Sequence, residues 1–170
     1  MKTNLKIAIT GPESSGKSTI AEFLAKELDG FLVKEYAVEF LENLKRKYTQ
    51  EDLDIVANEQ FQRWENTPNN KILIADTELI VIKIWSEYKY SKVSSNIIEK
   101  LNNQLFDHYY LCKPDIPWEW HEQRENPNDR NELFEMYLKE LKDRKLPFTI
   151  LSGTPENRIQ VAKKILSELF

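Results

Sequence analysis

The chain has 170 residues, 41% of them hydrophobic and 31% charged, and its 24 Lys and Arg against 28 Asp and Glu give a net charge of −4. The acidic balance disfavours a protein that grips nucleic-acid phosphates, and no apolar run approaches the roughly 18 residues of a membrane span. The single Cys112 excludes an intramolecular disulfide and fits a reducing compartment. We therefore expect one cytoplasmic domain over residues 1–170, with neither nucleic acid nor membrane as partner. The oligomeric state is left open.

Short apolar runs of strand length alternate along the chain with segments of helical spacing. The predicted strands are 6–10, 31–33, 72–75, 109–112 and 148–151. The predicted helices are 17–28, 37–44, 53–64, one that starts at 79, 133–141 and 155–169. Gly30 is placed to end the first helix, Thr49 to cap the third, and Thr154 to cap the last. Residues 86–108 receive no assignment.

This alternation predicts an α/β fold, a three-layer sandwich with a five-stranded parallel sheet covered by helices on both faces. In such sheets ligands bind at the carboxyl ends of the strands. The residues that follow the five predicted strands are Gly11, Glu35, Asp76, Lys113 and Gly153. We expect the site to lie among them.

A phosphate-binding motif follows the first strand. The segment Gly11-Pro-Glu-Ser-Ser-Gly-Lys-Ser18 matches G-x-x-x-x-G-K-[ST] without departure. Glycines allow the tight turns, backbone amides surround an anion, and the following helix adds its N-terminal dipole. Lys17 is expected to reach the β and γ phosphates and Ser18 to coordinate Mg²⁺. The predicted nucleotide-binding residues are Gly11, Glu13, Ser14, Ser15, Gly16, Lys17, Ser18 and Thr19.

Asp76 closes the third strand, where a Walker B carboxylate would stand. With Ser18 it is the predicted metal site, so the expected cofactor is Mg²⁺ with ATP. The alternative is that Asp76 caps the following helix. Glu78 is interpreted as a first-turn acid that complements the helix dipole.

The stretch from Lys113 to Asp129 contains three prolines and two tryptophans and shows no apolar period. We interpret approximately 113–130 as a lid. Arg124 and Arg130 at the lid are predicted catalytic residues that neutralise charge on the transferred phosphoryl group, with a solvated loop as the alternative. No Asn-Lys-x-Asp sequence marks a GTPase, and the small size leaves no room for the helical domain of a ring ATPase. This combination favours a small-molecule kinase.

The chain resembles the nicotinamide riboside kinase domain of bifunctional bacterial NAD-biosynthesis regulators and their stand-alone AAA-type ATPase relatives. The matching stretches are Gly11–Thr19, Lys34–Glu42, Ile74–Leu79 with Trp85-Ser86, Pro114–Trp118, Arg124 and Ser152-Gly153. They cover almost the whole chain, and the Glu-Tyr-Ala and Pro-Asp-Ile-Pro-Trp segments are the discriminating ones. Because the first strand begins near Leu5, we expect no helix-turn-helix or adenylyltransferase domain before it.

Two departures from the family pattern fall where substrate or lid contacts are expected. Val38 stands where the family usually has Arg, and His121-Glu122 where it usually has Asp-Gly. These departures do not affect the predicted nucleotide-binding residues, but they leave the identity of the acceptor undetermined.

The resemblance to small nucleoside kinases implies further site residues. Glu35 would accept the proton of the acceptor hydroxyl, with Asp76 as the rival base and a plain strand-end glutamate as the alternative. Tyr36, Trp118 and Trp120 are candidates to bind the substrate by stacking on a flat ring, with a hydrophobic anchor that fixes the lid as the alternative for Trp118. In similar kinases the loop at Gly153 packs beside adenine, so Gly153 would contact the nucleotide. Trp64 and Trp85 lie on helical stripes and are predicted core residues.

These observations predict an ATP-dependent kinase that phosphorylates a nucleoside hydroxyl, with nicotinamide riboside converted to nicotinamide mononucleotide as the leading reaction. Its partners would be ATP and a nucleoside-like acceptor. The alternative is a nucleotide-dependent binding or regulatory ATPase without a small-molecule acceptor.

Overall fold

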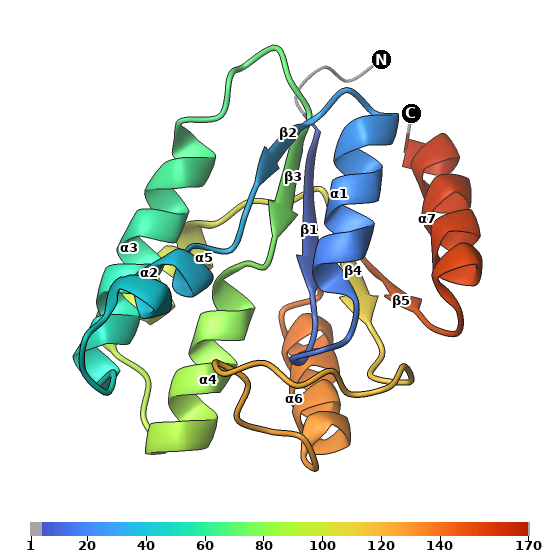
Figure 1. Cartoon of the computed structure of the whole chain (residues 1–170). Coiled ribbons are helices and arrows are strands. Elements are labelled where there is room, and N and C mark those ends of the chain that lie inside the picture. The colour runs from blue at the N-terminus through green and yellow to red at the C-terminus, as the bar shows by residue number, and fades with distance from the viewer. Residues whose placement is uncertain (1–4, 170) are drawn as a thin grey trace.

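The structure is a computed structural model that describes residues 5–169 (Figure 1). Its strands are β1 (Lys6–Thr10), β2 (Phe31–Val33), β3 (Leu73–Asp76), β4 (His108–Cys112) and β5 (Phe148–Leu151). Its helices are α1 (Lys17–Glu27), α2 (Tyr36–Asn43), α3 (Gln50–Glu65), α4 (Leu79–Tyr90), α5 (Ser95–Asn103), α6 (Arg130–Asp143) and α7 (Pro155–Leu169). The predicted alternation of strands and helices is confirmed.

The strands form one parallel sheet in the order β2-β3-β1-β4-β5. β1 lies in the middle, where Ala8 is in register with Ala75 of β3 on one side and Tyr109 of β4 on the other. The chain crosses from one side of β1 to the other between β3 and β4. The carboxyl end of β1 is therefore the switch point at which ligands bind in sheets of this kind.

Helices cover both faces of the sheet, which confirms the predicted three layers (Figure 1). Because successive side chains of a strand point to opposite faces, Ile7 and Ile9 pack against α1 and α7, whereas Ala8 belongs to the core with α3, α4, α5 and α6. Cys112 is fully buried in the first core, and Trp64, a predicted core residue, is buried in the second. Short strands with no polar face are stable here because both faces are covered.

Helix α5 was not predicted. Ser94 caps it by accepting a hydrogen bond from the Ile97 amide at 3.2 Å, and Ile97 and Leu101 are its buried residues. Ile97, Ile98 and Leu101 follow Ser94 at helical spacing, and this short signal was missed. The predicted caps at Thr49 and Thr154 stand at the starts of α3 and α7.

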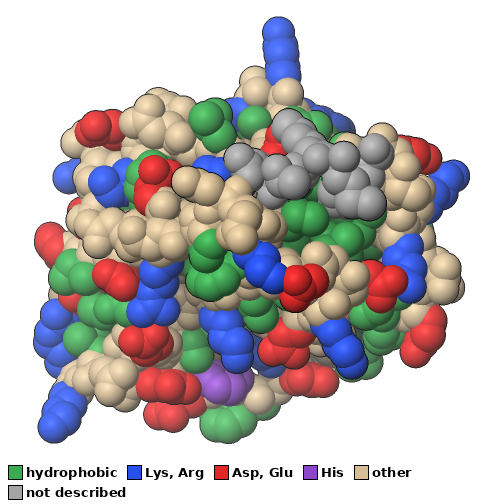
Figure 2. Space-filling model, turned by 90° about the horizontal axis from the view of Figure 1, so that it is seen from above, with side chains coloured by type: hydrophobic (Ala, Val, Ile, Leu, Met, Phe, Trp, Pro, Cys, Tyr) green, Lys and Arg blue, Asp and Glu red, His purple; other side chains and the backbone are tan. Residues whose placement is uncertain are grey.

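The carboxyl ends of the strands lie at the lower edge of the molecule in Figure 1. The lid segment, defined here as residues 113–129, contains neither helix nor strand and crosses this edge between β4 and α6. On the opposite end of the molecule, seen in Figure 2, acidic and basic side chains are interspersed. Within residues 5–169, none of the helices combines the length and apolar character of a membrane span.

Gly11 is the point at which β1 turns into the phosphate loop, and its φ of 135° favours glycine. A Cβ there would lie 2.6 Å from the backbone carbonyl oxygen of Cys112 in β4, which cannot move without disturbing the sheet. We expect Gly11→Ala to lower the free energy of unfolding by more than about 2 kcal/mol, measured by chemical denaturation.

Gly30→Ala is the matched control for this prediction. Its added Cβ would meet nothing closer than the Ile72 carbonyl oxygen at 3.1 Å, and its φ is not positive. Gly30→Ala should therefore lower the free energy of unfolding by less than Gly11→Ala does. An equal decrease in the two variants would contradict the role given to Gly11.

Candidate active site

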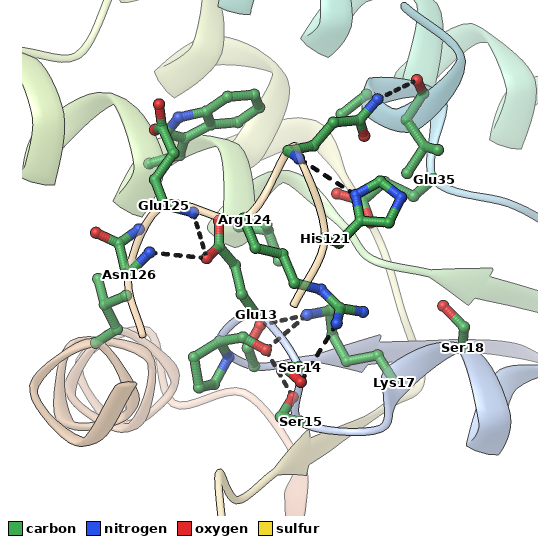
Figure 3. Close-up of a pocket in the computed structure, with 18 of the residues that line it drawn as sticks. Glu13, Ser14, Ser15, Lys17, Ser18, Glu35, His121, Arg124, Glu125 and Asn126 are labelled. Atoms are coloured by element: carbon green, nitrogen blue, oxygen red, sulfur yellow. Dashed lines mark hydrogen bonds between the residues drawn. The ribbon is translucent and has the colours of Figure 1, made fainter. Parts of the chain in front are cut away.

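A cavity of about 540 Å³ lies at the carboxyl edge of the sheet, between the phosphate loop (residues 11–18), α2, α4 and the lid segment (Figure 3). Its volume is in the range of small-molecule sites, about 300 to 1,000 Å³. All the predicted residues of the phosphate loop, with Thr19, line one end. The other end is largely apolar and aromatic, lined by Ala37, Val38, Leu41, Val81, Ile84, Trp85, Tyr88, Leu133 and Tyr137.

The phosphate loop turns tightly because Gly11, Ser14 and Gly16 have positive φ angles of 135°, 52° and 84°. The two glycines were predicted to supply such turns, and Ser14 adds another. A loop that directs its amides inward must direct its carbonyls outward, where buried oxygens need donors. Arg130 Nη1 donates to the Ser14 carbonyl at 3.0 Å, and Arg158 Nη1 donates to the Ser15 carbonyl at 2.5 Å.

Lys17 is the cation of this loop. Its Nζ donates to the carbonyl oxygens of Gly11 and Pro12, both at 2.8 Å. The ammonium group therefore already lies at the loop where a phosphate would bind. A charged phosphate oxygen is a stronger acceptor than these neutral carbonyls, so Lys17 can exchange one for the other when a nucleotide enters.

Asp76 and Ser18, the predicted metal ligands, are in direct contact. The Ser18 hydroxyl donates to Oδ2 of Asp76 at 2.7 Å. Within residues 5–169, the buried Oδ1 of Asp76 has no hydrogen-bond partner. Burial raises the pKa of this carboxyl, although the Ser18 hydrogen bond lowers it. A buried, unpartnered carboxylate oxygen next to a hydroxyl suits Mg²⁺, which prefers oxygen ligands.

Glu78 lies at the start of α4, where an acid complements the helix dipole, but at the cap position and not in the first turn. It is fully buried and is itself the cap of α4, accepting from the Ile80 amide at 2.7 Å. The Thr10 hydroxyl and the Gln104 amide also donate to its carboxylate, at 2.8 Å and 2.7 Å. Burial raises the pKa of Glu78 to about 7. Its network joins β1, α4 and the end of α5 behind Asp76.

Glu35 caps α2 directly after β2 and lies half-buried in the cavity wall. Burial raises the pKa of its carboxyl to about 7; Lys17 opposes this shift, and Asp76 adds to it. Glu35 thus exists in both protonation states near neutral pH, which suits a group that accepts a proton. The structure places it in one cavity with Lys17, and its chemical role stays a prediction.

The lid segment is docked on the phosphate loop (Figure 3). Glu13 Oε2 accepts from the amides of Glu125 and Asn126 at 3.0 Å and 3.2 Å. Arg124 lines the cavity, and its Nη1 donates to the Glu119 carbonyl at 2.5 Å and to the Ser14 hydroxyl at 3.4 Å. Arg124 therefore lies where a phosphate on the loop would meet it.

Arg130 lies differently from its predicted place over the phosphates. Its guanidinium donates to the carbonyls of Ser14 and Ile116, both at 3.0 Å, and lies 5.6 Å from the centre of the Trp118 ring. Neither Arg130 nor Trp118 lines the cavity. Because Arg130 donates both to a carbonyl of the phosphate loop and to one of the lid segment, it joins the lid segment to the outer side of the phosphate loop.

Tyr36 and Gly153 also lie outside the cavity lining. Tyr36 packs on Phe40 and under the Arg63 guanidinium, which is 4.5 Å from its ring centre. Gly153 turns the chain after β5, and its amide donates to Asp115 Oδ2 at 2.8 Å. Their predicted contacts with a substrate and with the nucleotide stay predictions.

Trp85, a predicted core residue, is half-buried: it packs against the second core and also lines the cavity. Its Nε1 donates to the Tyr48 hydroxyl at 3.0 Å. Sequence reasoning missed two cavity residues on the same face of α4, Tyr88 and Lys89, and the lid residue Glu125, which pairs with Lys89 at 2.9 Å. Residues 85, 88 and 89 are spaced to share one face of the helix that follows Asp76, the predicted metal ligand. That spacing was the signal that could have placed them at the site.

The chain has the fold of P-loop nucleoside and nucleotide kinases, in which a phosphate loop and a second, apolar pocket share one edge of a parallel sheet. Residues 6–158 match a family described as an AAA domain, and the chain belongs to that family. No curated protein matches the chain at the sequence level.

Solved structures of kinases have the same fold. The NadR protein in complex with NR has a TM-score of 0.81 at 19% identity; the match covers 98% of this chain and 50% of that one, so the chain spans about half of its length. Thymidylate kinase from Ehrlichia chaffeensis has a TM-score of 0.70 at 14% identity, over 98% and 99% of the two chains. Deoxyadenosine kinase from M. mycoides has a TM-score of 0.70 at 19% identity, over 98% and 100%.

The raised pKa of Glu35 makes a prediction about stability. Between its ordinary pKa of 4.5 and about 7, the folded protein keeps a proton on Glu35 that the unfolded chain releases. Raising the pH through this window therefore destabilises the wild type relative to Glu35→Gln, and the difference levels off above about 7. Chemical denaturation of both proteins at several pH values measures this difference.

Glu78 is unchanged in both proteins, so its own titration cancels from the comparison. A stability difference that stays constant across the window would contradict the burial given to Glu35.

Proposed function

We propose that the protein is an ATP-dependent kinase that transfers the γ-phosphoryl group to a nucleoside hydroxyl, with nicotinamide riboside as the leading acceptor. The observation that carries this proposal is a single cavity that joins a phosphate loop to an aromatic pocket and has Glu35 in its lining. The likeness to NadR in complex with NR supports the choice of acceptor. The likeness to deoxyadenosine kinase supports the wider class of nucleoside kinases.

The charges around the cavity favour a nucleoside over a nucleoside monophosphate. Among the described lining residues, the lysines and arginines are Lys17, Lys89 and Arg124. Lys17 and Arg124 lie at the phosphate loop, and Lys89 is paired with Glu125. A phosphate on the acceptor would find no unpaired cation at the aromatic end, whereas the positively charged pyridinium ring of nicotinamide riboside suits a pocket with Glu35 in its wall.

In the proposed reaction, the acceptor oxygen forms a bond to the γ phosphorus while the bond from that phosphorus to the oxygen of ADP breaks. Glu35, when ionised, takes the proton of the hydroxyl. Lys17 holds the β and γ phosphates, and Arg124 meets the charge of the transferred group from the lid side. Mg²⁺, held by Ser18 and Asp76, would neutralise phosphate charge when bound.

The alternative function, a regulatory ATPase without an acceptor, draws support from the two departures from the family pattern. Val38 and His121 both line the cavity, so both lie where an acceptor would be recognised.

One assay separates the two functions. ADP formation from Mg-ATP is measured with nicotinamide riboside, with thymidine monophosphate and with neither. We expect nicotinamide riboside alone to accelerate it and to be converted to its 5′-phosphate. Glu35→Gln should lower the rate of transfer by about 10² to 10⁴ with nearly unchanged ATP affinity.

The wild-type rate of transfer should rise with pH through about 7, as Glu35 ionises, and this rise should disappear in Glu35→Gln. Transfer by Glu35→Gln at the wild-type rate would remove Glu35 from the mechanism. A rate of ADP formation that none of the acceptors changes would favour the regulatory ATPase.

The position of Arg124 makes a second kinetic prediction. Its guanidinium meets a charge that grows in the transition state, so Arg124→Ala should lower kcat by about tenfold or more and weaken ATP binding less. Steady-state kinetics and equilibrium binding of ATP measure the two effects. Lys139→Ala, which removes an exposed lysine paired with Asp143 on α6, is the control and should leave both values unchanged. An unaltered kcat in Arg124→Ala would limit Arg124 to holding the lid.

A further inference from the structure

Arg158, in the first turns of α7, is among the largest fully buried side chains, and sequence reasoning gave it no role. Its guanidinium donates to three backbone carbonyls: to Gly153 at 3.0 Å, to Ser15 at 2.5 Å and to Lys113 at 2.7 Å. These carbonyls belong to the β5–α7 loop (residues 152–154), the phosphate loop and the start of the lid segment. One side chain thus joins the three segments.

Asp115 completes this arrangement. Its Oδ1 accepts from Nη2 of Arg158, and its Oδ2 accepts from the Gly153 amide at 2.8 Å. Arg158 is buried, whereas the Asp115 side chain is 30% exposed, so the desolvation cost falls mainly on the guanidinium. Its hydrogen bonds to Asp115 and to the three carbonyls offset that cost. The carboxylate also fixes the β5–α7 loop against the root of the lid segment.

The contact with Ser15 bears on phosphate binding. The Ser15 carbonyl and the Gly16 amide belong to the same peptide unit, so a donor on the carbonyl fixes the direction of that N–H. Gly16 itself lies against the guanidinium, since a Cβ there would be 3.4 Å from Nη1. Arg158 thus acts on the outer side of the loop and does not line the cavity.

We propose that Arg158, with Asp115, is a positioning residue for the nucleotide: it holds the phosphate loop in its anion-binding conformation and fixes the β5–α7 loop beside it. Arginine is required because its planar group directs donors to several acceptors at once, whereas the ammonium of lysine donates from one point. The inference rests on nucleotide binding at the loop and not on the identity of the acceptor.

The competing explanation is that the ion pair only stabilises the fold. The two explanations predict different ligand affinities for the folded Arg158→Met variant. If Arg158 positions the loop, then Arg158→Met weakens binding of both Mg-ATP and inorganic tripolyphosphate by about tenfold or more. Its KM for the acceptor stays near the wild-type value, and kcat at saturating ATP changes less than the affinity. A role in stability alone lowers the melting temperature and leaves both affinities unchanged.

Calorimetric titration of the two ligands decides between these outcomes. Lys164→Met, which removes an exposed cation from the same helix, is the matched control and should bind both ligands normally. Arg158→Lys keeps the charge and should still bind both ligands more weakly than the wild type. Asp115→Asn should shift both affinities in the same direction by a smaller factor.

If Arg158→Met fails to fold, the binding measurements on Arg158→Lys and Asp115→Asn serve as the test. Wild-type affinity for tripolyphosphate in folded Arg158→Met, or in both of the milder variants, would overturn the inference. A wild-type protein that binds ATP but does not phosphorylate nicotinamide riboside would overturn only the proposed acceptor. A wild-type protein that binds neither ATP nor tripolyphosphate would overturn both.

Discussion

A peptide unit points its N–H and its C=O in opposite directions, and the site of this protein is organised around that fact. Amides that converge on a phosphate leave a ring of carbonyls facing the protein, and each buried one needs a donor. Arg130 and Arg158 are donors of this kind, and they come from α6 and α7. Lys17 instead donates to the Gly11 and Pro12 carbonyls from the cavity side. The lid segment, the last helix and the phosphate loop are therefore joined by hydrogen bonds that the loop itself requires.

The same edge of the sheet concentrates carboxylates. Burial raises the pKa values of Glu13, Glu35, Asp76 and Glu78, and Lys17 opposes this shift at the first three. A triphosphate without a cation would add negative charge to this region. This edge of the sheet therefore suits a nucleotide that enters together with Mg²⁺. Glu35, with a pKa raised to about 7, also lets the site adjust its charge near neutral pH by binding or releasing a proton as ligands enter.

The sheet and its layers followed from the sequence because short apolar runs and amphipathic helices alternate so regularly. The phosphate loop followed from a motif whose every position has a steric or electrostatic reason. Helix α5 was missed because it is short and only Ile97, Ile98 and Leu101 mark its apolar side, although their spacing is helical. The surroundings of Arg130 and Trp85 depend on contacts between distant segments, which the sequence does not show. Loop carbonyls hold the Arg130 guanidinium, and the cavity exposes one side of Trp85, whose other contacts are with the core. Arg158 gave no signal, since an arginine on a polar helix turn looks solvated until the loops around it are known.

The burial of Cys112 has a practical consequence. Its thiol lies at the end of β4, packed between β1, β5 and α7, and burial raises its pKa to about 11. Thiolate is the reactive form, so alkylating reagents and oxidants meet an inert, inaccessible sulfur while the sheet is intact. The single cysteine is thus a natural chemical reporter: the rate at which it is labelled measures how often the centre of the sheet opens, without any probe having to be introduced.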